Sequence, residues 1–115
     1  MEMGTLAKNF QNVFLDMCWG HIISPEAARR ALIEWLDVVP ANKIHAFGGD
    51  YCFVGGVYGH QYIARRNVAH SLAHKVNDAS ISISRAEEIA SWMFRDNPID
   101  LFKLERFLGR EQGGK

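Results

Sequence analysis

The feature that most constrains the fold is a short stretch in the middle of the chain, Lys43 to Tyr51, which reads KIHAFGGDY. Its apolar residues are too few for a helix, and two glycines end them abruptly before a single carboxylate, Asp50. A short apolar run bounded by turn residues is typical of a strand in a parallel sheet that is covered on both faces. Because functional residues of parallel α/β folds gather where the strands end, the position of Asp50 favours chemistry.

The composition predicts one folded domain with no electrostatic preference for large anionic partners. The chain has 115 residues, 48% of them hydrophobic, and a formal net charge of zero. It should therefore bury a core and bind neither nucleic acid nor a membrane surface. The first residues lack the features of a signal peptide and no stretch is apolar enough to span a bilayer, which predicts a cytoplasmic location. In that compartment Cys18 and Cys52 are expected to be unpaired thiols.

The stretch before residue 50 predicts a strand, a helix and a second strand. Large apolar residues from Val13 to Cys18 are typical of a strand. Ser24 and Pro25 then suit the N-cap and the first position of a helix. The apolar face of that helix is expected to contain Ala28, Ala31, Leu32, Trp35, Leu36 and Val39. The second strand runs from Lys43 to Gly48, and a crossover of this length requires parallel, neighbouring strands.

The rest of the chain is expected to be helical. A helix from about Tyr58 to Asn77 completes a βαβα order, and its predicted inward residues are Tyr62, Ala69, Leu72, Ala73 and Val76. Ser84 and Glu87 match a capping box that would open a helix to about Arg95. Asn97-Pro98 should interrupt the chain before a last helix, Ile99 to Leu108, with Ile99, Phe102 and Leu108 available for packing.

These elements amount to a single partial domain over residues 1–115. Two βα units occupy about residues 12–77, C-terminal helices occupy 84–108, and residues 109–115 are expected to be a frayed tail. A sheet of two strands is marginal in water. The chain therefore has either further strands or a place in something larger.

The residues that follow the two predicted strands form the main candidate site. Trp19 and His21 follow the first strand, and Asp50 and Tyr51 follow the second, so parallel pairing would bring them into one crevice. A carboxylate can bind a metal or accept a proton, an imidazole can do either, and aromatic rings can enclose a substrate. His60, near the start of the next helix, could join them. The structural alternative is that Asp50 caps a turn and Trp19 belongs to the core.

Two weaker patterns predict ordinary structure. The glycine-rich loop from Gly48 to Gly59 could hold a phosphate, but Val54 stands where the dinucleotide fingerprint has its first glycine, and the Gly-Lys-Ser/Thr ending of a P-loop is absent. His70 and His74 have a metal-chelating spacing, but Ser71 replaces the glutamate of the zinc-protease motif. We expect a turn in the first case and a solvated helix face in the second.

The run NVFLDMCWGHIISPEAARRALIEWLDVVPANKIHAFGGDY, followed by VYGHQYIARRNVA and MFRDNPIDLF, resembles the C-terminal part of amidohydrolase-superfamily enzymes in the branch near uronate isomerase. The resemblance implies the last two strands of a (β/α)8 TIM barrel and a metal-dependent hydrolase or sugar-acid isomerase. It makes Asp50 a residue of a divalent metal site, most often zinc, and the catalytic base. It also implies that Trp19 and His21 line the substrate pocket, to which the strand-end positions add Tyr51 and His60.

The chain departs from that family in lacking the His-x-His pair that supplies the first metal ligands. A complete barrel needs ~250 residues, so we expect an incomplete barrel, inactive alone, that binds no metal by itself. Its partners would be a small-molecule substrate in the full enzyme and the missing barrel half. The alternative is a non-catalytic, self-assembling α/β module whose sheet is completed by a second copy or another chain.

Overall fold

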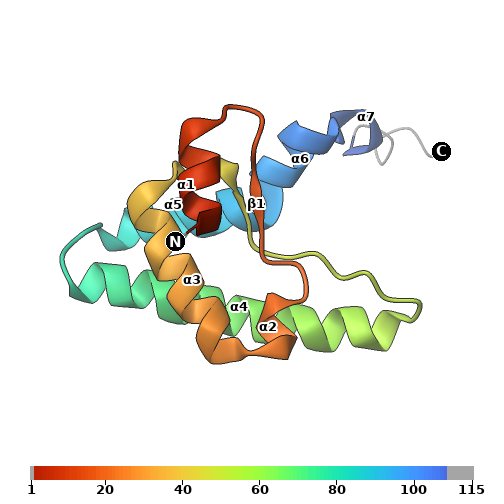
Figure 1. Cartoon of the computed structure of the whole chain (residues 1–115). Coiled ribbons are helices and arrows are strands. Elements are labelled where there is room, and N and C mark those ends of the chain that lie inside the picture. Colours follow the sequence, from red (N-terminus) through yellow and green to blue (C-terminus); the bar gives the residue numbers. More distant parts are fainter. Residues whose placement is uncertain (1, 109–115) are drawn as a thin grey trace.

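A computed structural model describes residues 2–108 and shows a mixed α/β chain that is mostly helical (Figure 1). Its strands are β1 (Leu15–Asp16) and β2 (Ile44–His45), joined by the helix α3 (Pro25–Val38). The strands are parallel, with Leu15 opposite Ile44 and Asp16 opposite His45. The predicted order of strand, helix and parallel strand is therefore confirmed.

Both strands are shorter than the predicted segments, Val13 to Cys18 and Lys43 to Gly48. At the end of β1, Cys18 has a positive φ of 35°, and its N–H donates a hydrogen bond of 2.6 Å to the Asp16 carboxylate. This local bond turns the chain, because an Asp side chain can hydrogen-bond the backbone two residues on. A short 3₁₀ helix, η1 (Ala41–Lys43), occupies the start of the second predicted strand.

The helix α3 forms as its sequence predicts. The Ser24 hydroxyl accepts a hydrogen bond of 3.2 Å from the N–H of Ala27, and Pro25 stands at the first helical position. The buried residues of its apolar face are Ala28, Leu32 and Trp35, and Val39, which follows the helix, is buried as well. Residues at three- and four-residue steps share one helix face, so this periodicity was sufficient to identify the packed side.

The helix α4 (Val54–Asn77) begins at Val54 rather than Tyr58, and its predicted inward face is largely wrong. Of the five expected residues only Leu72 is fully buried; Val76 is half-buried, and Tyr62, Ala69 and Ala73 are exposed. The buried face instead carries His60, Ala64, Asn67, Val68, Ser71, Leu72 and Lys75.

Within residues 2–108, no helix combines the length and apolar character required to cross a bilayer.

Polar residues can face inward on α4 because neighbouring elements supply partners. The Ser71 hydroxyl donates to the carbonyl of Arg29 in α3 at 3.3 Å. The Lys75 ammonium lies 2.5 Å from the Asp37 carboxylate, which is also carried by α3. Buried polar groups are tolerated when they are hydrogen-bonded, so these contacts replace the apolar packing that periodicity predicted.

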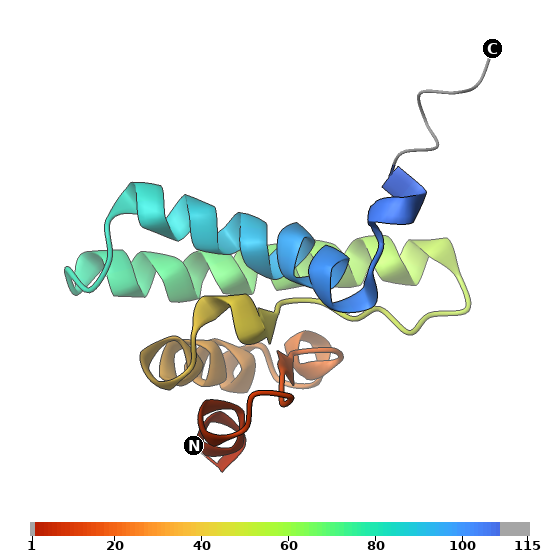
Figure 2. The ribbon, with the colours of Figure 1, turned by 90° about the horizontal axis from the view of Figure 1, so that it is seen from above.

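The helix α5 (Ile83–Ser91) runs back beside α4 (Figure 2). Its N-cap is Ser82, whose hydroxyl accepts a hydrogen bond of 3.1 Å from the N–H of Arg85. The predicted capping box of Ser84 and Glu87 is wrong, because the helix already begins at Ile83 and both residues lie inside it.

The chain does not break at Asn97-Pro98 as predicted. A π-helical segment, η2 (Trp92–Asp96), continues α5 into α6 (Asn97–Phe102). Lys103, with a φ of 55°, ends α6 and separates it from α7 (Glu105–Leu108). Of the residues expected to pack, Ile99 is half-buried, whereas Phe102 and Leu108 are exposed. The predicted frayed tail, 109–115, lies outside the described residues.

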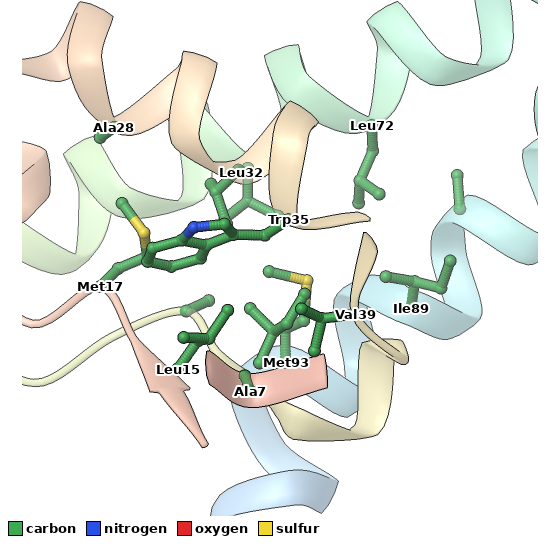
Figure 3. Packing of buried hydrophobic residues seen from close by; sticks show 14 residues of the cluster. Ala7, Leu15, Met17, Ala28, Leu32, Trp35, Val39, Leu72, Ile89 and Met93 are labelled. Atoms are coloured by element: carbon green, nitrogen blue, oxygen red, sulfur yellow. The ribbon is translucent and has the colours of Figure 1, made fainter. Parts of the chain in front are cut away.

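The hydrophobic core lies between the strand pair and the helices around it (Figure 3). α1 (Glu2–Asn9) contributes Ala7 and packs on α3, and the short helix α2 (Gly20–Ile23) contacts both α3 and α4. The largest apolar side chains of the core are Leu15, Met17, Leu32, Trp35, Ile44, Leu72, Ile89 and Met93. Both strands contribute to this core, so it fixes their positions.

The two edges of the strand pair differ. On the outer edge of β2, the N–H of Ala46 donates to the carbonyl of Met93 at 3.0 Å, and the Asn97 amide donates to the carbonyl of Ile44 at 2.8 Å. On β1, the N–H of Met17 points to β2. The backbone groups of Asp16 therefore point away from β2, where no other segment of residues 2–108 bonds them. The edge of β2 is covered and that of β1 is open.

Candidate functional site

The carboxyl ends of β1 and β2 bring two aromatic side chains together, as parallel pairing predicts. The rings of Trp19 and Tyr51 are stacked, with centroids 5.5 Å apart and an interplanar angle of 19°. The indole Nε1–H of Trp19 also donates a hydrogen bond of 3.0 Å to the carbonyl of Gly49. Trp19 is 40% exposed, so it belongs to the surface of the site and not to the core.

Asp50 lies between the two residues that Trp19 contacts. Its side chain is exposed, and its backbone has a φ of 46°. This left-handed conformation is uncommon for residues other than glycine, although Asp adopts it more readily than most. Within residues 2–108 the Asp50 carboxylate makes no hydrogen bond or ion pair. It is therefore available to a group from outside this part of the chain, and it does not cap a turn.

His21 is fully buried and uses both ring nitrogens inside the fold. Its Nε2 lies 2.7 Å from the carbonyl of Ala46, and its Nδ1 lies 3.2 Å from the side-chain nitrogen of Asn67. A carbonyl only accepts, so Nε2 carries the proton and Nδ1 accepts from Asn67. Burial lowers the pKa of His21, against the raising effect of the Ala46 carbonyl. The side chain joins α2 to α4 and to Ala46, just beyond β2, as a neutral imidazole.

His60 is buried without comparable partners. Its side chain is 2% exposed, and neither ring nitrogen makes a hydrogen bond within the described chain. The ring instead lies edge-on to Phe47 at 5.0 Å, to Tyr51 at 5.7 Å and to His21 at 6.2 Å. Burial lowers the pKa of His60; the backbone of Cys18 offsets part of this effect without reaching hydrogen-bond geometry. The two ring nitrogens of His60, one a donor and one an acceptor, are thus enclosed by aromatic rings without a hydrogen-bond partner in the described residues.

In the glycine-rich loop, the missing side chain of Gly56 makes room for two aromatic rings. A Cβ atom on Gly56, in the first turn of α4, would lie 2.7 Å from the Tyr51 ring and 2.8 Å from the Phe53 ring. The two rings are edge to face, with centroids 5.6 Å apart. They approach the backbone at Gly56, and glycine is required there because a side chain would collide with both rings. The feature predicted as a turn therefore packs aromatic rings against α4.

Two polar residues of this region were not predicted from the sequence. Asp16 ends β1, and its carboxylate oxygen lies beside Gly48, where an added Cβ would be 3.4 Å away. Asn67 is buried and holds His21. Asn67, Ser71 and Lys75 recur at four-residue steps along α4, and this polar periodicity was the available signal for a buried polar face.

The described residues do not form a metal site on their own. Within residues 2–108 no three His, Cys, Asp or Glu side chains are grouped closely enough to hold a metal ion. The nitrogens of His21 are engaged in the fold, and His70 and His74 are exposed, as predicted. Cys18 and Cys52 are free thiols, also as predicted. Since a divalent metal in a protein usually has four or more ligands, Asp50 alone does not fit one.

Comparisons of the chain with protein-family models, with curated proteins and with solved structures found no match. The likeness to the amidohydrolase superfamily therefore stays a prediction from the residues that carry it.

Proposed function

We propose that this chain forms the last two βα units of an amidohydrolase-like (β/α)8 barrel and supplies Asp50 to a metal-dependent active site. Asp50 would act as a proton acceptor for a hydrolase or a uronate isomerase-like enzyme that acts on a small-molecule substrate. The metal ligands, zinc being the expected ion, would come from polypeptide outside this chain. The observation that carries the proposal is the unpartnered Asp50 carboxylate at the carboxyl end of a parallel strand.

The geometry around Asp50 supports this role. The stacked rings of Trp19 and Tyr51 form an apolar surface beside an exposed carboxylate, and such a surface can exclude water from one face of a substrate. His21 and His60 are buried, and the His60 ring lies edge-on to Tyr51 and to His21. In the proposed site, Trp19 and Tyr51 contact the substrate, whereas His21 and His60 support the two loops.

The DNA upstream of the Met1 codon gives the most direct test. The proposal expects a coding sequence for a His-x-His strand there, in frame or interrupted. In the resulting longer polypeptide, Asp50→Asn should lower kcat for uronates or small carboxylic-acid substrates by about 100-fold or more, as loss of a general base does. Asp16→Asn is the matched control at the neighbouring strand end. Wild-type activity of Asp50→Asn would overturn the assignment.

The purified 115-residue chain provides a second test. With added Zn²⁺ and the same substrates it should show no turnover, because the ligands that would hold the ion with Asp50 are not part of it. Turnover by this chain alone would contradict the proposal that it is one part of a larger active site.

A self-assembling, non-catalytic module is the second candidate function, and the open edge of β1 favours it. An edge strand with unpaired backbone groups can pair with another chain. Sedimentation distinguishes the two candidates. A discrete oligomer that unfolds cooperatively supports the module, whereas a monomer, or aggregation with poor cooperativity, supports a part of a barrel.

A further inference from the structure

The backbone of Asp50 has a left-handed conformation that its own side chain does not stabilise. A non-glycine residue in the left-handed region costs about 1 kcal/mol, and although Asp adopts it more readily than most residues, surrounding contacts are needed to hold it there. Asp50 has a φ of 46° and an exposed side chain that makes no contact able to hold it. The restraint must therefore act through the residues on either side.

Both neighbours of Asp50 are held by the same side chain. Before Asp50, the carbonyl of Gly49 accepts the indole N–H of Trp19 at 3.0 Å. After it, the Tyr51 ring stacks on the same indole at 5.5 Å. The hydrogen bond limits the orientation of the Gly49 peptide, and the ring stacking limits the position of Tyr51.

Trp19 is itself well supported. Its carbonyl accepts hydrogen bonds of 3.1 Å from the N–H groups of both Ile22 and Ile23, which places Trp19 at the N-cap of α2. Two residues further on, the buried His21 ties α2 to Ala46 just beyond β2. On the other side, Tyr51 is backed by the edge of the buried His60 ring. The indole therefore connects two anchored segments.

We propose that Trp19 is a positioning residue, whose indole N–H and stacked ring together hold Asp50 in its left-handed conformation with the carboxylate in solvent. The proposal deepens the function given above, because it rests on that function for the importance of Asp50. The conformational part stands independently, since it concerns only contacts within this chain.

The experiment is an NMR comparison of the purified chain with two variants. Trp19→Ala removes both contacts, and Trp19→Phe keeps a ring for stacking but removes the N–H donor. The ¹³Cα shift and the three-bond HN–Hα coupling of Asp50 report its φ. We expect the left-handed values in the wild type, their complete loss in Trp19→Ala and a partial loss in Trp19→Phe. The control is Trp92→Ala, since Trp92 lies in η2 and contacts Arg85; it should leave Asp50 unchanged.

Left-handed Asp50 signals in folded Trp19→Ala would overturn the proposal, as would an equal loss in Trp92→Ala. If Trp19→Ala does not fold, Trp19→Phe decides, because unchanged Asp50 signals in it would show that the hydrogen bond restrains nothing. A failure of the proposed function is distinguishable. In that case the Trp19 variants release Asp50 as expected, but neither they nor Asp50→Asn alters the activity of the longer polypeptide.

Discussion

The amino and carboxyl ends of the strand pair are built in different ways. At the amino end, Asn97 donates hydrogen bonds of 2.8 Å to the carbonyls of both Ala41 and Ile44, and the Lys43 ammonium donates to two carbonyls of the α1 region. At the carboxyl end, Cys18 and Asp50 have positive φ angles and the buried His60 lacks hydrogen bonds. The amino end bonds the backbone carbonyls that Asn97 and Lys43 reach, although the buried Nε2 of His45 has no hydrogen bond in the described residues. The carboxyl end keeps strain and an unpartnered carboxylate. In parallel α/β folds this division separates stability from chemistry.

The largest effect is expected from Asn97→Ala at the amino end. The substitution leaves the buried Ile44 carbonyl and the Ala41 carbonyl without their donor, so the free energy of unfolding should fall by about 3 kcal/mol. Urea denaturation measures it. Asn42→Ala, an exposed residue of η1, is the matched control and should change little. A loss below about 1 kcal/mol for Asn97→Ala would show that water replaces the amide and that this end is not specially stabilised.

Lys43→Met tests the second set of stabilising hydrogen bonds at the amino end. The ammonium lies 2.6 Å from the carbonyl of Ala7 and 2.7 Å from that of Phe10. Methionine keeps much of the apolar stem but cannot donate a hydrogen bond, so the free energy of unfolding should fall by about 1 to 2 kcal/mol. The loss is smaller than for a fully buried charged hydrogen bond, because water partly screens the ammonium. Amide exchange in α1 should increase at the same time. Lys8→Met on the exposed side of α1 is the control, and an equal effect from it would remove the distinction.

Among the buried histidines, His21 and His60 make the carboxyl end sensitive to acid. Their pKa values are lowered in the folded chain, so the unfolded chain binds protons first and stability falls as the pH drops below ~6.5, by at most about 1.4 kcal/mol per pH unit for each ring. The groups that face them are the Ala46 carbonyl, Asn67 and the more distant Asp16. His60→Phe should flatten this dependence between pH 7 and pH 5.

The control for the acid effect is His70→Gln, because His70 is exposed on α4. Denaturation at several pH values compares the three chains. A slope that is unchanged by His60→Phe would mean that His60 is not held neutral by burial, and it would weaken the contrast between the two ends.

The smallest effect is expected from Asp50→Gly. Glycine adopts a positive φ without a steric cost, so the chain should become more stable by about 0.5 kcal/mol, part of the gain being offset by the flexibility of glycine when unfolded. The matched variant is Asp16→Gly, which should destabilise, because it removes the acceptor for the N–H of Cys18. If Asp50→Gly lowered the stability instead, the left-handed backbone of Asp50 would not be a source of strain at the carboxyl end.

The features that the sequence predicted correctly depend on local rules. Ser24-Pro25 and the spacing of Leu32 and Trp35 are enough to define α3, and parallel pairing is enough to bring Trp19 and Tyr51 together. The inward face of α4 could not be predicted, because Asn67 and Lys75 are buried only through partners distant in sequence. The same reason applies to His21 and His60. A histidine after a strand or near a helix start suggests a ligand, and only the packing shows that both are buried.

The covered edge of β2 has a kinetic consequence. A strand that joins the sheet beside β1 meets free backbone groups, so encounter and orientation set its association rate. A strand that joins beside β2 must wait until the C-terminal helices open and release the N–H of Ala46 and the carbonyl of Ile44. Any larger sheet would therefore assemble in a fixed order, first at β1 and later at β2. Release of the segment from Met93 to Asn97 would then limit the rate of that second step.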